Sequence, residues 1–202
     1  MLKNEDTPKK DLLFEHLKRN RGIITYKDCK TIGLPTIYLT RFEQAKYLTR
    51  VEKGIYLSTH ANYDEYYFFQ YHYPRTIFSY ISALYLQGIT DEIPQYYEVT
   101  VPKGYRFRRP AQNVHVHTVP KEFLNLGVAC TITPMGGKVR AYNFERIVCD
   151  MIYNRSTIDT ELFVKTLQTY STYPKQNIAK LHEYASRMDI LDEVKKTLEV
   201  LL

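Results

Sequence analysis

The sequence is poor in cysteine, with only Cys29, Cys130 and Cys149 among its 202 residues, and these are widely spaced. It contains no CxxC pair, which argues against a disulfide framework or a structural zinc site. We therefore expect buried thiols in a reducing compartment. No run approaches the ~18–20 apolar residues of a membrane span. The N-terminus, MLKNEDTPKK, lacks the apolar core of a secretion signal. These absences favour a cytoplasmic protein with no membrane contact.

Sequence motifs of several enzyme classes are also missing, namely GxSxG, HExxH and GxxxxGK[ST]. The nearest approach to a nuclease pattern is Asp91, Glu98 and Lys103. Glu98 and Lys103 are five residues apart, so on a regular strand they face opposite sides. His115 and His117 alternate on a predicted strand and share a face, but no nearby Cys, Asp or third His completes a zinc site. We predict no catalytic residue, no metal and no cofactor.

Positive charge is in excess and is unevenly distributed. The net charge is +6; residues 1–58 hold 12 Lys and Arg against 7 Asp and Glu, and residues 99–146 hold 8 against 2. Such basic segments attract polyanions and make binding depend on salt. The 44% hydrophobic and 14% aromatic fractions indicate a folded chain. Its length suits one or two domains.

Residues 21–58 have the pattern of a compact DNA-binding module. Thr25 suits the N-cap of a short helix, and Gly33 suits its end because glycine adopts positive φ without strain. Two helices joined by such a glycine-bearing turn form a helix-turn-helix unit. Lys53-Gly54 suits a hairpin turn, so a two-stranded wing follows. The predicted elements are helices at 8–19, 25–31 and 36–47 and strands at 48–52 and 55–58.

The third predicted helix has two different faces. Leu39, Phe42 and either Ala45 or the stem of Lys46 are expected to point inward. The opposite face carries hydrogen-bonding side chains suited to base edges in a major groove, while basic residues on the wing suit phosphate. The alternative is a solvated polar face on a small helical domain. The side chains that we predict to contact DNA are Thr36, Thr40, Arg41, Gln44, Arg50 and Lys53.

The stretch YDEYYFFQYHY, residues 63–73, is crowded with tyrosine and phenylalanine. Aromatic side chains stack on unpaired bases, or more often pack domains or subunits together. We favour packing between domains. We therefore predict a winged helix-turn-helix domain at 1–60, an aromatic-rich connector at 61–74 and a second domain at 75–202.

The second domain is predicted to mix helices and strands and to end in a helical bundle, which makes the whole chain α+β. Thr76 is a plausible cap for its first helix. Apolar residues at three- and four-residue spacing mark the C-terminal helices. The predicted strands are 96–101, 105–109, 114–119, 127–133 and 138–142, and the predicted helices are 76–87, 143–153, 159–171, 175–187 and 189–201.

Several segments, in this order, resemble the AbiEi-type antitoxins of bacterial abortive-infection and type IV toxin–antitoxin systems. They are EKGIYLS, YPRTIFSYISALYLQGITDEIPQYYEVTVPKG, NFERIVCDMI, LHEYASRM and the final LEVLL. Together they extend over about the whole chain. Residues 40–47 carry Thr, Phe and Gln where Arg and Leu are frequent in the family, so an operator sequence is not transferable.

The resemblance implies an antitoxin that is not an enzyme. Its winged domain would bind inverted repeats in the promoter of its own operon and repress it, as a monomer in solution that pairs cooperatively on double-stranded DNA. Its second domain would counter a co-encoded nucleotidyltransferase-like toxin without forming a stable complex. The alternative is a transcriptional regulator whose second domain senses a ligand or dimerises. A toxin-like gene immediately downstream would favour the antitoxin.

The second basic segment is our candidate for an antitoxic surface. Its side chains would contact DNA that flanks the wing, or an RNA or nucleotide that the toxin also uses. The residues are Lys103, Arg106, Arg108 and Arg109. Two interpretations remain for Glu145, Arg146 and Asp150: an intrahelical or buried ion pair, or a functional site.

Overall fold

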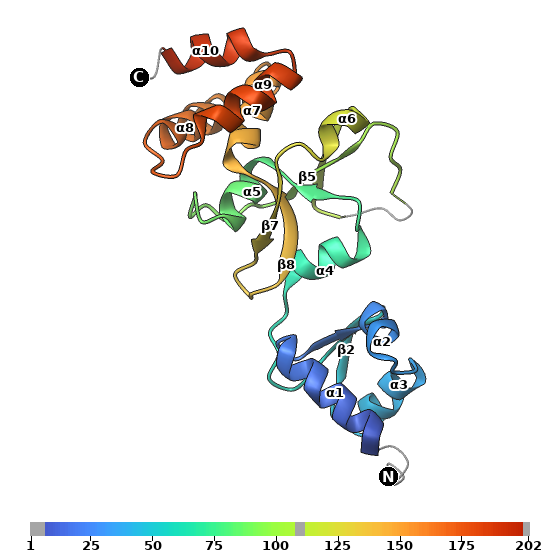
Figure 1. Cartoon of the computed structure of the whole chain (residues 1–202). Coiled ribbons are helices and arrows are strands. Elements are labelled where there is room, and N and C mark those ends of the chain that lie inside the picture. Colours follow the sequence, from blue (N-terminus) through green and yellow to red (C-terminus); the bar gives the residue numbers. More distant parts are fainter. Residues whose placement is uncertain (1–6, 108–111, 200–202) are drawn as a thin grey trace. The chain divides into compact units, whose positions relative to one another are not determined.

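The chain divides into two compact units, residues 1–68 and 69–202. The computed structural model describes residues 7–107 and 112–199, and Figure 1 draws them with their labels. The division lies inside the stretch that the sequence assigns to a connector. Aromatic rings there pack within their own unit: Phe68 lies 4.9 Å from Tyr63, and Phe69 lies 4.7 Å from Tyr97, between ring centroids. Packing of these rings between the domains stays a prediction.

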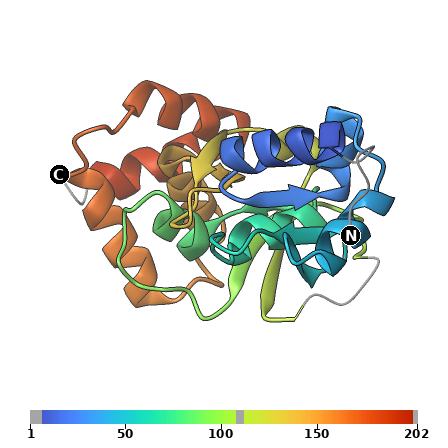
Figure 2. The same cartoon turned by 90° about the horizontal axis from the view of Figure 1, so that it is seen from below.

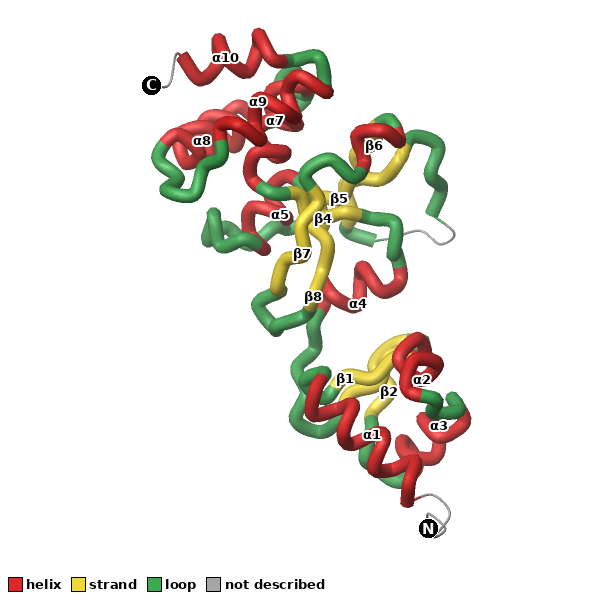
Figure 3. Tube along the Cα trace, viewed as in Figure 1, coloured by secondary structure: helices red, strands yellow, loops and turns green. Residues whose placement is uncertain are grey.

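The first unit has the element order of a winged helix-turn-helix, with a small antiparallel sheet ordered β1–β3–β2 (Figure 3). The sequence did not predict β1, because three residues are too few to show a period of two. Its strand identity comes from pairing with β3, where Ile24 lies opposite Tyr56. The elements are α1 (Thr7–Arg19), β1 (Ile23–Thr25), α2 (Tyr26–Ile32), α3 (Ile37–Gln44), β2 (Thr49–Glu52) and β3 (Ile55–Leu57).

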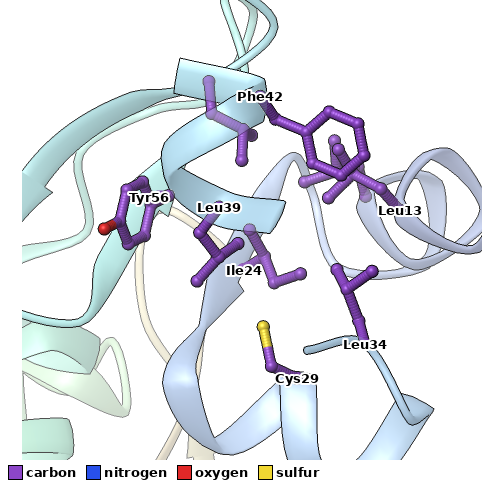
Figure 4. Close-up of a cluster of buried hydrophobic side chains, with 9 residues drawn as sticks. Leu13, Ile24, Cys29, Leu34, Leu39, Phe42 and Tyr56 are labelled. Atoms are coloured by element: carbon purple, nitrogen blue, oxygen red, sulfur yellow. The ribbon is translucent and has the colours of Figure 1, made fainter. Parts of the chain in front are cut away.

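A single apolar cluster holds these elements together. Side chains converge from all three helices and from β1 and β3 (Figure 4). Leu13, Ile24, Leu39 and Phe42 are fully buried. Burial of a Leu, Ile or Phe side chain contributes about 1.5–3 kcal/mol, so this cluster sets the orientation of α3.

Helix α3 ends three residues earlier than predicted. Ala45 and Lys46 are exposed, so the expectation that either points inward is wrong. Lys46 adopts φ +62°, and the Tyr47 N–H donates to the Phe42 carbonyl at 2.9 Å. This left-handed turn satisfies the last free carbonyls of the helix and directs the chain into β2.

The start of α2 matches its sequence signature. Thr25 Oγ1 accepts a hydrogen bond from the Asp28 N–H at 3.2 Å, and Asp28 Oδ2 accepts one from the Thr25 N–H at 2.8 Å. This reciprocal pair is a capping box. At the other end, Gly33 adopts φ +69°, as the sequence predicts.

Thr25→Ala should lower the free energy of unfolding of the first unit by about 1 kcal/mol, because it leaves an N-terminal amide of α2 without its acceptor. Urea unfolding of the full chain, followed by circular dichroism, measures the change. Thr31→Ala is the matched control: its exposed hydroxyl lies on the same helix and donates to the Lys27 carbonyl. Equal stability of the two variants would contradict the capping role.

The second unit contains a mixed sheet ordered β6–β5–β4–β8–β7. Strand pairs β5–β6 and β4–β8 are parallel, while β4–β5 and β7–β8 are antiparallel. The sequence did not predict α4, which crosses the division, or α6. The elements are α4 (Glu65–His72), β4 (Ile77–Phe78), α5 (Tyr80–Leu86), β5 (Tyr97–Pro102), β6 (Val114–Val119), α6 (Lys121–Leu124), β7 (Val128–Ile132), β8 (Lys138–Tyr142), α7 (Phe144–Tyr153), α8 (Thr160–Ser171), α9 (Ile178–Arg187) and α10 (Leu191–Glu199).

Two secondary-structure elements predicted for this unit are wrong. The helix expected over 76–87 begins only at Tyr80, and Thr76 does not cap it, because Ile77 and Phe78 pair with β5 in the middle of the sheet. The strand expected over 105–109 is a loop at 105–107, and its last two residues lie outside the described chain. The ring of Phe107 packs 5.2 Å from Tyr73, between ring centroids, and β6 pairs in parallel with β5.

The C-terminal helices, drawn in orange and red, lie together in Figures 1 and 2. Helix α7 contacts α5, α8, α9 and α10. It is buried at every position from Phe144 to Ile152. The helices predicted over 143–153, 159–171, 175–187 and 189–201 are therefore confirmed within one to three residues of their starts. No helix in the described part of the chain is both long and apolar enough to span a membrane.

The three thiols are free, but they differ in exposure. Burial raises the pKa of Cys29 to about 11 and of Cys149 to about 12, so both stay protonated at neutral pH. Cys130 is exposed, and here the expectation of a buried thiol is wrong. It lies on β7, which is an edge strand of the sheet.

Arg146 and Asp150 form a buried ion pair on α7, with 2.9 Å between Nε and Oδ1. The Arg146 Nη1 also donates to the carbonyls of Phe123 and Leu126, at 2.5 and 2.9 Å. A side chain at Gly127 would collide with Arg146, because an added Cβ would lie 2.5 Å from the arginine Cβ. Of the two interpretations of these residues, the geometry supports the ion pair. Glu145 instead accepts from the Asn177 N–H at 2.9 Å and joins α7 to the start of α9.

Arg146→Met should destabilise the second unit by roughly 3–5 kcal/mol, because it leaves Asp150 charged and unpaired in the core. Urea unfolding of the full chain gives the value. The double variant Arg146→Met/Asp150→Leu should recover much of this loss, since an apolar pair of similar volume removes both charges. This account would be contradicted if the free energy of unfolding of Arg146→Met lay within about 1 kcal/mol of the wild-type value.

Candidate nucleic-acid interface

The polar stripe of α3 faces solvent. Thr40, Arg41 and Gln44 are exposed, and they lie opposite the fully buried Leu39 and Phe42. Residues three, four and seven apart share one side of a helix, so the stripe is continuous. Thr36 is the N-cap residue of α3; it is exposed and makes no side-chain capping bond. The structure thus brings together the four α3 side chains that the sequence singles out.

Arg41 packs on an aromatic ring, a contact that was not predicted from the sequence. Its guanidinium carbon lies 4.9 Å from the ring centroid of Tyr38, and that ring lies 5.9 Å from Phe42 of the core. A cation over an aromatic face gains about 0.5–1 kcal/mol at an exposed site, so the contact restricts the arginine. The sequence contains the information needed to predict this contact, because residues three positions apart on a helix, such as Tyr38 and Arg41, are neighbours on its surface.

The wing is short and is tied to the helices. Arg50 lies on β2 and is exposed, with its Nε 3.4 Å from the Glu52 carbonyl. The strand register shifts between Arg50 and Glu52, which is a β-bulge. Lys53 is exposed in the turn, beside Gly54 at φ +80°. The Gly54 carbonyl accepts from the Tyr26 N–H at 3.0 Å, so the turn is anchored at the start of α2.

Tyr56 links the wing to α2. It is 2% exposed, and its hydroxyl lies 3.5 Å from that of Tyr26. Burial, and after it the hydrogen bond with Tyr26, raises the pKa of Tyr56 to about 12; the nearby Arg50 acts in the opposite direction. Tyr56 is therefore neutral at physiological pH.

The second basic segment is described only in part. Lys103 and Arg106 are exposed, whereas Arg108 and Arg109 lie outside the described residues. The turn that carries Lys103 is well anchored: its backbone N–H donates to the Val119 carbonyl at 2.8 Å. Two of the four predicted cations are thus exposed on the second unit. That they contact DNA flanking the wing, or an RNA or nucleotide that the toxin also uses, stays a prediction.

A cluster of Glu98, His115 and His117 lies on β5 and β6. The sequence indicated that the two histidines share a face but not that Glu98 joins them. The Glu98 carboxylate contacts both His115, at 3.4 Å, and His117. His115 stacks on Tyr96 with 4.5 Å between centroids, and His117 packs 4.0 Å from Tyr80. Glu98 joins the histidines because β5 and β6 pair in parallel, which the sequence pattern does not reveal. Among the described residues, no group of three or more His, Cys, Asp or Glu is arranged to hold a metal ion.

Comparison with known protein families gives a match over the first unit. Residues 11–59 match the family model described as "Transcriptional regulator, AbiEi antitoxin". The matched segment runs from α1 through the end of the wing, so it includes every predicted DNA-contacting side chain. No curated protein matches the chain. Residues 11–59 therefore form a transcriptional-regulator domain of the AbiEi antitoxin family.

Proposed function

We propose that this protein is the antitoxin of a type IV toxin–antitoxin system and represses its own operon by binding inverted repeats in the promoter. The observation that carries the DNA-binding half is the exposed stripe on α3, opposite Leu39 and Phe42, within a domain of a regulator family. The wing adds two exposed cations, Arg50 and Lys53. The action takes place in the cytoplasm, where promoter DNA lies.

In this proposal α3 enters the major groove. Arg41 donates two hydrogen bonds to a guanine, and Gln44 bonds to an adenine, because these side chains match those base edges. Thr36 and Thr40 contact neighbouring bases or phosphates. Arg50 and Lys53 neutralise phosphates and carry no sequence information.

An inverted repeat presents two half-sites related by two-fold symmetry, so two copies of the chain bind side by side. A monomer in solution that pairs on DNA satisfies this requirement. Repression then varies steeply with the concentration of free antitoxin, because at low occupancy the fraction of operators with both half-sites bound depends on the second power of that concentration.

The second unit carries the antitoxic activity in this proposal. It opposes a co-encoded nucleotidyltransferase-like toxin by acting on what the toxin uses, an RNA or a nucleotide, without a stable complex with the toxin. Lys103 and Arg106 are exposed cations suited to such a polyanion. No catalytic residue is needed for this competition, and we propose none.

Arg41→Ala should reduce the preference for operator over random duplex by ~1–3 kcal/mol, because one bidentate base contact is lost. Arg50→Ala and Lys53→Ala should weaken both duplexes alike, and each should lower the slope of log affinity against log salt by about one. Gel-shift titrations at several salt concentrations separate the two effects. Lys18→Ala on α1 is a control for loss of a surface charge. If none of the three variants differs from wild type, the DNA-contacting surface is wrongly placed.

Lys103→Glu combined with Arg106→Glu should abolish growth rescue from the toxin while leaving operator binding intact, because the charge reversal repels a polyanion. Growth is measured with both genes on unrelated promoters, so that autoregulation plays no part. Arg41→Ala should still rescue growth under these conditions. Lys195→Glu, at another exposed lysine of the second unit, is the control. Loss of rescue by Arg41→Ala and not by the double reversal would contradict the proposed division of labour.

A further inference from the structure

Ile37 is an apolar side chain in an unexpected place. It is the first residue of α3 and is 57% exposed. Within the described part of the first unit it is more exposed than the other large apolar side chains on the surface, such as Tyr63 at 53% and Leu12 at 39%. The apolar core does not require it, since Leu39 and Phe42 fill the inward side of the helix.

Ile37 belongs to the polar stripe by position. It precedes Thr40, Arg41 and Gln44 by three, four and seven residues, so all four side chains lie on one side of α3. The exposed part of the Ile37 side chain is in contact with water and does not stabilise the fold. Contact with an apolar group on a partner would remove this apolar surface from water. In the proposed function the partner of the α3 stripe is the major groove of DNA.

We infer that Ile37 reads the 5-methyl group of a thymine in the operator. This inference rests on the proposed DNA binding and deepens it. Among the base edges in the major groove, the thymine methyl is the apolar group that an aliphatic side chain recognises. The first residues of a recognition helix are also those that reach the base edges.

The helix geometry places this thymine relative to the other contacts. Ile37 and Arg41 are four residues apart, which is ~6 Å along the helix axis. Base pairs are ~3.4 Å apart, so the thymine lies about one or two base pairs from the guanine that Arg41 binds. Each half-site therefore contains a methyl-bearing pair next to, or one pair removed from, a G·C pair.

The probe is the duplex that the full-length chain selects from a randomised pool, with each thymine replaced in turn by deoxyuridine. This replacement removes one methyl and leaves every hydrogen-bonding group in place. One position in each half-site should weaken wild-type binding about fourfold, the effect of withdrawing one methyl-sized group from an apolar contact. Ile37→Ala should bind the thymine and uracil duplexes equally. Because Ile37 is exposed, this variant should fold normally.

Leu12→Ala, another exposed aliphatic residue in the same unit, should keep the wild-type sensitivity to thymine. The inference is overturned if wild type binds every uracil duplex as tightly as its thymine parent. It is equally overturned if Ile37→Ala still loses affinity when thymine is replaced by deoxyuridine. It is also overturned if Ile37→Ala lowers only the cooperativity of binding, because Ile37 would then be a contact between protein copies. Failure of wild type to bind duplex DNA in a salt-dependent manner would instead refute the proposed function.

Discussion

The burial of Leu39 and Phe42 against Leu13 and Ile24 decides how the first unit works. Helix α3 is only eight residues long, and the apolar contacts of Leu39 and Phe42 set its rotation about its own axis. Once they form, the opposite stripe must face solvent, because helical periodicity allows no other arrangement. The wing then follows directly, since the left-handed turn at Lys46 sends the chain from α3 into β2.

The second unit depends on a different kind of constraint. Arg146 is a buried cation that contacts Asp150, two backbone carbonyls and the ring of Tyr142 at 4.3 Å, while its buried Nη2 has no hydrogen-bond partner among the described residues. These partners come from α7, from α6 and the turn that follows it, and from β8, so one side chain ties helices to the sheet. A buried charge tolerates few alternative arrangements, because each unsatisfied group is destabilising.

The three helices and the wing of the first unit were predictable, apart from the early end of α3, because their signals are local. The capping box at Thr25, the glycine at 33 and the Lys53-Gly54 turn act over three or four residues. The errors arose where long-range pairing overrode a local pattern: Ile77 and Phe78 carry a helical spacing but pair with β5. The Glu98 cluster was likewise missed, since only the parallel register of β5 and β6 brings its carboxylate to His115 and His117.

The α+β class, the helix-turn-helix with its wing, the C-terminal helices and the two basic segments could be predicted from the sequence, because periodicity, capping and charge are properties of neighbouring residues. Long-range contacts were needed to show that α3 ends at Gln44 and that Arg146 is a buried structural ion. These features depend on which distant segments occupy the space around a side chain, and no local pattern encodes that.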